Sequence, residues 1–478
     1  MTTITMEPSQ FKSEKMTFSV LAASAPVMVP RLGKLALAGR KTLSTPHYIP
    51  LTSRGTVPHI AHDMLRKETA LNSLYIGLED FITKKNPSPV YNIPVTEGES
   101  PLRNFICATD DMPIILAPRR FPAIPCPPNN TDTSIAILTS VGFRQLPAHQ
   151  YLDSIRTLKP DIAIGLADIV YGREPGVKRR AKMVDRTHAF TQDALERLYG
   201  KSVPAEQKQK STDTAYFAPV LPLDNAQQSL YLDDLQDELK SHVSGLALYE
   251  SASLAQIPES LGALPRLLLS QPGGPHDLLR DVSLGGDLLT LPFVGECSDA
   301  GIALDFTFPT ASDVNANANG SALQPKALGI DLWSADTAKD VSALSDGCQC
   351  YACRKHHRAY FNHLLNAKEM AAWALLQMHN YHVMDVFFAG VRDSIQRGTF
   401  EEDVQSFSRM YVSELPQRTG EGPRLRGYQL QAGPHKRGPR VYGRLDDVSQ
   451  KFAESQSSVA TPDTDASGLE HHGFAKKV

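Results

Sequence analysis

Long apolar runs are missing from this sequence. No apolar run in the 478 residues approaches the roughly 20 residues that a helix needs to cross a bilayer. The first residues, MTTITMEPSQFKSEKMTFSV, also lack the apolar core of a secretory signal and the Arg-rich amphipathic pattern of a mitochondrial matrix transit peptide. These absences predict a cytoplasmic protein with no transmembrane segment.

Cysteine is scarce, and neither sign of charge prevails. Six cysteines in 478 residues are too few for a disulfide framework, so a reducing intracellular compartment is the expected environment. The formal net charge of -3 gives no global attraction to nucleic acid or to a membrane surface. Binding of either kind would therefore have to come from a local patch.

Strand-like apolar runs alternate with helical patterns along most of the chain. Tyr151–Val170 is typical of an amphipathic helix followed by a buried strand, and Leu264–Val294 of a strand, a Pro/Gly turn, a helix and a second strand. This alternation predicts βα units on a parallel sheet. Eight such units with insertions fit about 400 residues, so the expected fold is an α/β TIM (β/α)8 barrel.

Composition also marks the segments that interrupt this alternation. Residues 1–15 are predicted to be a disordered leader, and the barrel is expected to span residues 16–412. The polar stretch 200–215 and the Asn/Ala/Ser-rich stretch 310–325 are predicted loop insertions. Residues 413–478 lack sustained apolar periodicity and are predicted to be a mostly disordered tail.

Half of the cysteines lie within six residues, in the order C-x-C-x-x-C. They are Cys348, Cys350 and Cys353. Thiolates this close together in a reducing compartment usually share a metal ion. His379 follows the last cysteine by 26 residues, after a helical apolar pattern, and is the predicted fourth ligand. Three other histidines are rivals for that position: His356, His357 and His363.

The proposed ligand set is typical of a structural site. Three cysteines and one histidine fill all four positions of a tetrahedral zinc ion and leave none for water or substrate. We therefore expect one structural Zn2+ per chain, bound in a C-terminal subdomain at about residues 330–400.

The metal signature CQCYACRKHHRAYFNHLLNAKEMAAWALLQMHN resembles that of the tRNA-guanine transglycosylases. Three further stretches are similar to family segments in the same order: Arg31–Ile60, Ser244–Glu250 (SGLALYE) and Pro265–Leu289 (PRLLLSQPGGPHDLLRDVSLGGDLL). The resemblance implies a TIM barrel that exchanges a guanine in a tRNA anticodon for a modified base. That chemistry needs an aspartate that attacks C1′ of the ribose, and a second carboxylate that handles protons.

The catalytic residues that the resemblance implies are largely missing. Thr290 stands where the family's nucleophilic aspartate is expected. The stretch 110–135 holds prolines in place of the family's base-binding Asp-Ser-Gly-Gly. Ser244 and Tyr249 replace glycines of a loop that the base approaches. We therefore predict no catalytic residue in this chain and assign it to the non-catalytic accessory branch of the family.

Three aspartates keep an active enzyme open as an alternative. Asp305 lies in ALDFTFP, which superficially resembles the nucleophile segment, and Asp168 lies one position out of register with the family's acidic pair. Asp287 matches a structural aspartate of the family and is expected to be a hydrogen-bond partner at a strand end. A second alternative is a zinc-stabilised barrel with an unrelated scaffolding role.

The resemblance also implies partners. In the family, the accessory subunit pairs with a catalytic barrel, and the zinc subdomain with its following helix forms much of the dimer surface. The heterodimer inserts queuine at the wobble position of tRNAs with GUN anticodons, and the accessory subunit is associated with the mitochondrial outer membrane. This chain is accordingly expected to support the exchange through dimerisation and tRNA positioning.

Two basic stretches are candidates for contact with RNA. Arg173–Arg186 holds six basic residues against two acids, and Pro416–Arg444 holds seven Lys/Arg against one Glu. The alternatives are a solvated helix face for the first stretch and a plain disordered extension for the second.

Overall fold

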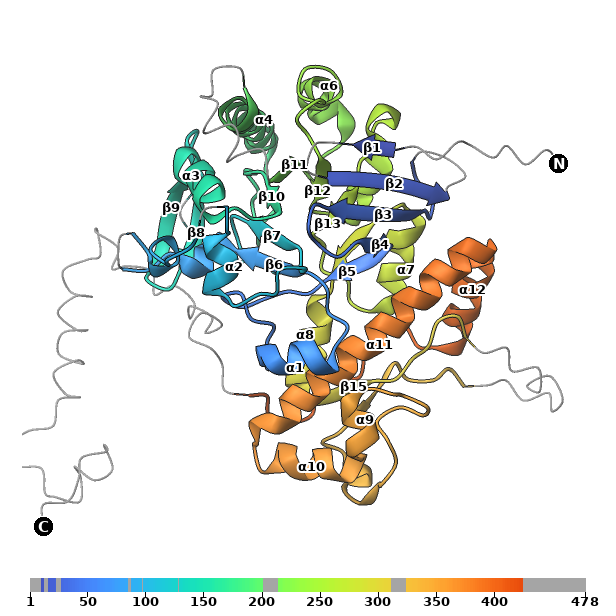
Figure 1. The fold of residues 1–478 in the computed structure, drawn as a ribbon. Coiled ribbons are helices and arrows are strands. Elements are labelled where there is room, and N and C mark those ends of the chain that lie inside the picture. Colours follow the sequence, from blue (N-terminus) through green and yellow to red (C-terminus); the bar gives the residue numbers. More distant parts are fainter. Residues whose placement is uncertain are drawn as a thin grey trace, which may run out of the picture. The chain divides into compact units, whose positions relative to one another are not determined.

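Eight parallel strands in the described part of the chain form one sheet that curves into a barrel (Figure 1). In sheet order they are β5 (His47–Ile49), β14 (Leu288–Thr290), β13 (Arg266–Leu268), β12 (Gly245–Leu248), β11 (Ala215–Val220), β10 (Ile162–Ile164), β7 (Ile114–Ala117) and β6 (Leu74–Gly77). The two edges meet where Leu51 pairs with Tyr75 in parallel and the Tyr75 amide donates to the Pro50 carbonyl at 2.9 Å. The nearly closed barrel confirms the predicted TIM-like α/β class.

The computed structural model describes residues 10–12, 16–22, 27–84, 87–96, 98–127, 129–200, 214–310 and 324–423. Most of the predicted leader 1–15 and of the loop insertions 200–215 and 310–325 lies outside these ranges. The predicted tail lies outside them from residue 424 onward.

Most residues of the barrel strands are apolar because both of their faces are buried. In β10, Ile162 and Ile164 belong to the core inside the barrel, whereas Ala163 belongs to the core beneath the surrounding helices. Strand residues point alternately to the two faces, so each short strand contributes to both cores.

A four-stranded antiparallel sheet closes one end of the barrel. It consists of β1 (Gln10–Lys12), β2 (Met16–Ala22), β3 (Leu32–Leu37) and β4 (Leu43–Thr45). Phe18, Leu35 and Leu43 share the inner core with the barrel residues. Because β4 leads directly into β5, this sheet covers the end at which the strands begin. The other end, formed by the carboxyl ends of the strands and the loops that follow them, is called the barrel mouth below.

Helices cover the outside of the barrel (Figure 1). They are α1 (His62–Glu68), α2 (Pro101–Phe105), α3 (Ala148–Leu158), α4 (Val177–Tyr199), α6 (Ser229–Gln236), α7 (Pro275–Ser283) and α8 (Pro292–Ala300). A hairpin of β8 (Ser134–Thr139) and β9 (Gly142–Pro147) is inserted between β7 and α3. The predicted helix–strand pair at 151–170 and strand–helix–strand unit at 264–294 are confirmed as α3–β10 and β13–α7–β14.

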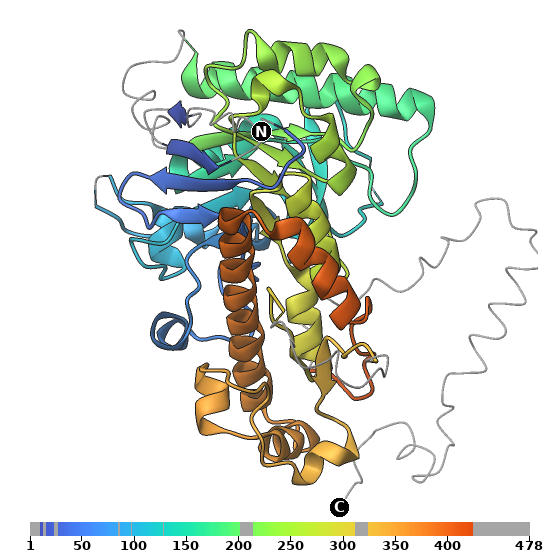
Figure 2. The same ribbon diagram turned by 90° about the vertical axis from the view of Figure 1, so that its right-hand side faces the viewer.

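A C-terminal subdomain follows α8. Its elements are β15 (Ile302–Leu304), β16 (Gly329–Asp331), α9 (Tyr351–Lys355), α10 (Arg358–Asn366), α11 (Met370–Arg397) and α12 (Phe400–Met410). Figure 2 shows the long helix α11 running from this subdomain to the barrel. There the Tyr48 hydroxyl donates to the Asp385 carboxylate at 2.6 Å, and Arg392 donates to the Pro46 carbonyl at 2.8 Å. In the described residues, no helix combines the length and the apolar composition needed to cross a bilayer.

Candidate functional site

The four predicted metal ligands lie together in the C-terminal subdomain. The sulfur atoms of Cys348, Cys350 and Cys353 lie 3.7, 3.5 and 3.4 Å from Nδ1 of His379. All four ligand atoms lie within 4.8 Å of one another. A tetrahedral zinc ion, with bonds of about 2.3 Å to sulfur and about 2.0 Å to nitrogen, separates such atoms by about 3.5 Å. The side chains are therefore spaced as ligands of one metal ion.

The local fold of the cysteine segment presents its sulfur atoms to one point. Cys350 caps the short helix α9, and its sulfur accepts the backbone N–H of Cys353 at 3.3 Å. Hydrogen bonds with the two other cysteines lower the pKa of Cys348, and hydrogen bonds with Cys348 and Cys353 raise the pKa of Cys350. The cluster thus favours a thiolate at Cys348, and thiolate is the form of cysteine that binds metal ions.

His379 is fully buried on α11, and its neighbours orient its ring. Its Nε2 faces the Leu304 carbonyl at 2.9 Å, which directs Nδ1 toward the sulfur atoms. The next residue, Asn380, accepts the Leu304 N–H at 2.9 Å and donates to the Ile302 carbonyl at 3.0 Å. This pair of side chains ties α11 to β15. Asn380 belongs to the His-Asn pair that ends the metal signature, but only the structure shows that it positions α11 against β15.

The three rival histidines lie outside this cluster. His357 caps α10, and its Nδ1 accepts the Tyr360 N–H at 3.2 Å. The His356 ring stacks on the Tyr360 ring with centroids 5.0 Å apart. His363 is exposed on α10. His379 is therefore the histidine that the fold brings to the cysteines.

Thr290 lies at the barrel mouth, at the end of β14, and is fully buried. Its hydroxyl donates to the carbonyls of Ser270 at 2.9 Å and Leu268 at 3.3 Å. A hydroxyl becomes a nucleophile when a neighbouring base removes its proton. Here the proton is directed at backbone carbonyls, which are not bases of that kind.

Two of the alternative aspartates lie away from the barrel mouth. Asp287 precedes β14, at the opposite end of the barrel, where its carboxylate binds Arg31 and accepts the Arg266 N–H at 2.8 Å. This confirms the predicted hydrogen-bond role. Asp305 follows β15 in the C-terminal subdomain, and its carboxylate accepts the Ser345 hydroxyl. Neither carboxylate is placed to attack a substrate at the barrel mouth.

Asp168 lies at the barrel mouth, but its carboxylate is fully engaged. It accepts two bonds of 2.5 Å from Arg179, one of 3.1 Å from Arg186 and one of 2.5 Å from Asn130. Burial by itself would raise the pKa of Asp168, but these donors lower it below its usual value. The carboxylate is thus a poor base and anchors helix α4 to the barrel.

Two buried arginines lie within the stretch 110–135, in which the resemblance implies Asp-Ser-Gly-Gly. Arg119 and Arg120 follow β7 after one intervening proline, and both are buried. Arg119 lies 5.4 Å from the centre of the Tyr171 ring and donates to the Ala136 carbonyl in β8 at 2.8 Å. Both side chains are thus bound to neighbouring elements of the chain itself. The sequence offered one sign of these arginines' role: they stand as a pair in PRRFP, directly after an apolar run.

Arg120 forms a buried ionic group with two acids of the neighbouring strand connection. Its guanidinium lies 3.0 Å from Glu79 and 2.9 Å from Asp80, and it donates to the Leu138 carbonyl at 2.7 Å. Glu79 in turn accepts the backbone N–H of Leu138 at 2.9 Å. The group therefore ties the β8–β9 hairpin to the chain segments that follow β6 and β7.

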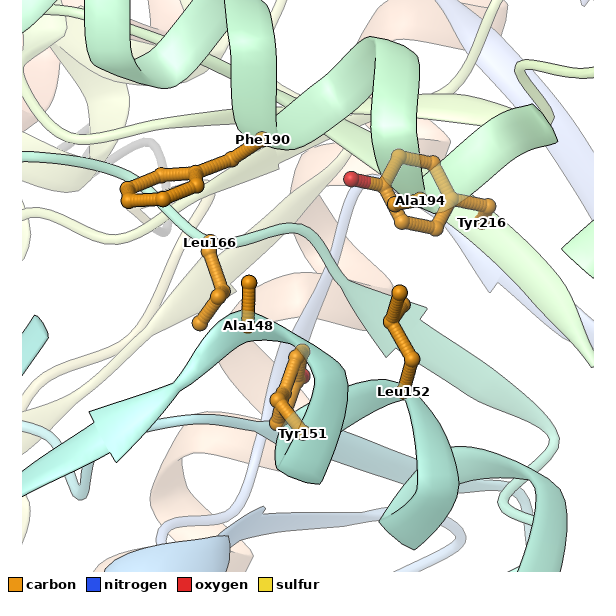
Figure 3. Close-up of a pocket in the computed structure, with 7 residues that line it drawn as sticks. All are labelled: Ala148, Tyr151, Leu152, Leu166, Phe190, Ala194 and Tyr216. Carbon is orange, nitrogen blue, oxygen red and sulfur yellow. The ribbon is translucent and has the colours of Figure 1, made fainter. Parts of the chain in front are cut away.

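A small apolar cavity lies elsewhere, between α3 and α4 outside the barrel. Figure 3 shows its lining, which consists of Ala148, Tyr151, Leu152, Leu166, Phe190, Ala194 and Tyr216. No charged side chain lines this cavity, so it lacks the convergent polar groups of a small-molecule site.

Comparisons with known proteins agree with this geometry. A family model described as Queuine tRNA-ribosyltransferase matches residues 28–413. The Schizosaccharomyces pombe protein named queuine tRNA-ribosyltransferase accessory subunit 2 is 35% identical over 395 residues, covering 82% of this chain and 83% of the relative. Proteins of the same name are 26% identical in Gallus gallus and 24% in Homo sapiens, covering 77% of this chain and 91% and 93% of those relatives. The chain therefore belongs to the queuine tRNA-ribosyltransferase family.

Proposed function

We propose that this chain is a non-catalytic accessory subunit of a heterodimeric queuine tRNA-ribosyltransferase, which supports exchange of guanine for queuine at the wobble position of tRNAs with GUN anticodons. The observation that carries the proposal is the barrel mouth. Thr290 stands at the expected nucleophile position with its hydroxyl bound to backbone carbonyls, and the buried Arg119 and Arg120 lie in the stretch where the base-binding segment is expected. The accessory-subunit names of the relatives support the same assignment.

The metal cluster is proposed to hold one structural Zn2+. Its donors are three sulfur atoms and one imidazole nitrogen, a set typical of zinc, and they occupy all four tetrahedral positions. When bound, the ion cross-links the loop before α9 to the middle of α11. Leu304 and Asn380 support this cross-link, because they hold α11 against β15.

The surface proposed to bind the catalytic subunit lies on the same subdomain. Val341, Tyr360 and Met370 are among the exposed large apolar residues there. The Ala359 N–H donates to the Asp340 carbonyl at 2.7 Å, which places Val341 beside the start of α10 and close to Tyr360. Exposed aromatic and aliphatic residues on one face commonly mark a partner surface. The tie between α11 and the metal cluster would hold that surface rigid.

Positioning of tRNA is proposed to occur through the complex. Within the basic stretch 173–186, Arg179 and Arg186 bind the buried Asp168, and Arg180 pairs with Glu174 at 2.7 Å. Lys178 and Lys182 are exposed. Arg173 is exposed as well and donates to the Asn129 side chain at 3.2 Å. Three of the six basic residues of this stretch are therefore engaged by acids of the chain, and the three exposed ones are the candidates for phosphates. The cytoplasmic location and peripheral association with the mitochondrial outer membrane stay predictions from the resemblance.

The proposed function is tested by base exchange into tRNA with labelled queuine. We expect no turnover by this chain alone, none or little by the catalytic subunit alone, and full turnover by the mixture. Turnover by this chain alone would overturn the proposal and favour the alternative of an active enzyme. A chain that neither binds the catalytic subunit nor raises turnover would favour the scaffolding alternative.

The partner surface yields a matched pair of variants. Val341→Asp is expected to weaken binding to the catalytic subunit about tenfold or more, because a charge would be buried in an apolar contact. Leu230→Asp on α6 is the control, since Val341 and Leu230 are both 76% exposed. Titration followed by light scattering or calorimetry measures the affinity of each variant for the catalytic subunit. Equal affinities for the two variants would show that the partner binds elsewhere.

A further inference from the structure

A basic surface lies where the C-terminal subdomain meets helix α1. Residues 351–367 contain three Lys/Arg and three His but no Asp/Glu, whereas the whole chain has a net charge of -3. Arg354 and Lys355 of this stretch are exposed in the last turn of α9. Arg66 and Lys67 are exposed in the last turn of α1. These four residues are called the basic patch below.

An ion pair brings the two helix ends together. Arg354 lies 3.4 Å from the carboxylate of Glu68, the last residue of α1. Figure 1 shows α1 next to the C-terminal subdomain. In the described part of the chain, Lys67 and Lys355 form no ion pair. Because α1 and α9 contain only two acids, Asp63 and Glu68, against the four cations, the patch keeps an excess of positive charge.

The patch lies beside two features that the proposed function uses. Helix α1 follows the loop that leaves the barrel mouth after β5. On the α9 side, His356 follows Lys355, and its ring stacks on the Tyr360 ring with centroids 5.0 Å apart. Tyr360 belongs to the surface proposed to bind the catalytic subunit. We therefore expect an RNA that spans the two subunits to be within reach of the patch.

We infer that the basic patch binds backbone phosphates of the tRNA held by the heterodimer. The inference rests on the proposed function and adds a binding surface to it, separate from the exposed basic residues of the stretch 173–186. Lysines and arginines that neutralise phosphates supply affinity that does not depend on the base sequence, because counter-ions of the RNA are released. Such contacts would orient the tRNA without taking part in the exchange of its base.

RNA is favoured over an anionic membrane as the ligand of the patch. A segment that binds a membrane surface needs an apolar face that enters the lipid. The exposed residues of α1 and α9 are all charged: Asp63, Arg66, Lys67, Arg354 and Lys355. Neither helix therefore offers such a face.

The test measures tRNA binding by the heterodimer of this chain and its catalytic subunit over a range of salt concentrations. The double variant Lys67→Gln/Lys355→Gln removes two exposed charges and no ion pair of the described chain, so the fold is expected to stay intact. Binding is expected to weaken about tenfold at low salt. Each lost phosphate contact is also expected to reduce the slope of log K against log salt by about 0.7 to 0.9. Unchanged affinity and slope would overturn the inference.

The matched control is the double variant Lys34→Gln/Lys240→Gln, which changes the net charge by the same amount. Both lysines are exposed, and both lie at the end of the barrel opposite the mouth, since Lys34 is in β3 and Lys240 precedes β12. We expect this variant to bind tRNA as the wild type does. Equal weakening by the two double variants would indicate a general effect of net charge and would overturn the inference.

Two further measurements separate RNA from other ligands of the patch. The affinity of Lys67→Gln/Lys355→Gln for the catalytic subunit, measured by light scattering, is expected to be unchanged, and a loss would assign the patch to the subunit interface instead. Loss of binding to vesicles of phosphatidylserine and phosphatidylcholine, with tRNA binding intact, would overturn the inference in favour of a membrane role.

The wild-type complex is measured first, by light scattering and by base exchange. A wild-type chain that forms no heterodimer would refute the proposed function itself. A wild-type heterodimer that exchanges the base, combined with unchanged tRNA binding by Lys67→Gln/Lys355→Gln, would refute only the role of the patch.

Discussion

Replacing Cys353 with Ser is expected to release the metal ion and unfold the C-terminal subdomain. Removing one sulfur breaks a four-ligand site whose metal contributes about 10–16 kcal/mol to folding in isolated zinc-finger peptides. The cluster joins the loop before α9 to α11, which also carries the Asp385 and Arg392 contacts to the barrel. Metal content by atomic spectroscopy and thermal unfolding measure the two effects. His379→Ala is expected to give the same result.

The control for this prediction is His363→Ala. His363 lies in the same sequence stretch and is exposed on α10, outside the cluster. We expect that variant to keep one metal ion per chain and wild-type thermal unfolding. Loss of metal from His363→Ala, or retention by His379→Ala, would show that a different histidine is the ligand.

Replacing Arg120 with Ala is expected to lower the free energy of unfolding by about 3–5 kcal/mol, because Glu79 and Asp80 would be left buried without their counter-ion. The β8–β9 hairpin would also lose the bond from Arg120 to Leu138. Chemical denaturation at pH 7 measures the change. Arg180→Ala is the matched control, since its partner Glu174 is largely exposed and such surface pairs contribute about 1 kcal/mol or less.

The loss of folding stability caused by Arg120→Ala is expected to depend on pH. Burial already raises the pKa of Glu79 above its usual value, although Arg120 opposes the effect, so removing Arg120 raises this pKa further. The folded state then binds more protons than the unfolded state between the two pKa values. Stability of the variant is therefore expected to recover as the pH falls from 7 toward 5. A deficit that does not change over this range would contradict the assignment of a buried, uncompensated carboxylate.

The Arg120 prediction concerns the barrel mouth, where the fold is retained while the residues that the resemblance implies are replaced. Barrel scaffolds tolerate new residues at the mouth because the sheet and helices, and not the loops, carry most of the core. Here Arg119, Arg120 and Asp168 bind neighbouring elements of the chain itself. These side chains at the barrel mouth thus stabilise the fold of the chain.

Local sequence patterns by themselves determined the fold class and the composition of the metal cluster. The alternation of strand-like runs and helical patterns involves residues that are close together in the chain. The C-x-C-x-x-C spacing does so as well. Both patterns can therefore be recognised in the sequence without knowledge of tertiary contacts. The absence of an aspartate at Thr290 was likewise visible from residue identity alone.

Only the tertiary structure decided which distant groups meet. His379 prevails over His356, His357 and His363 because β15 and α11 pack together and direct its ring to the sulfur atoms. Asp287 and Asp305 lie away from the barrel mouth, because Asp287 precedes a strand and Asp305 belongs to a different subdomain. Half of the basic residues at 173–186 bind Asp168 or Glu174. Ion pairs and the metal-ligand set join residues that are far apart in the chain, and no local sequence pattern predicts such contacts.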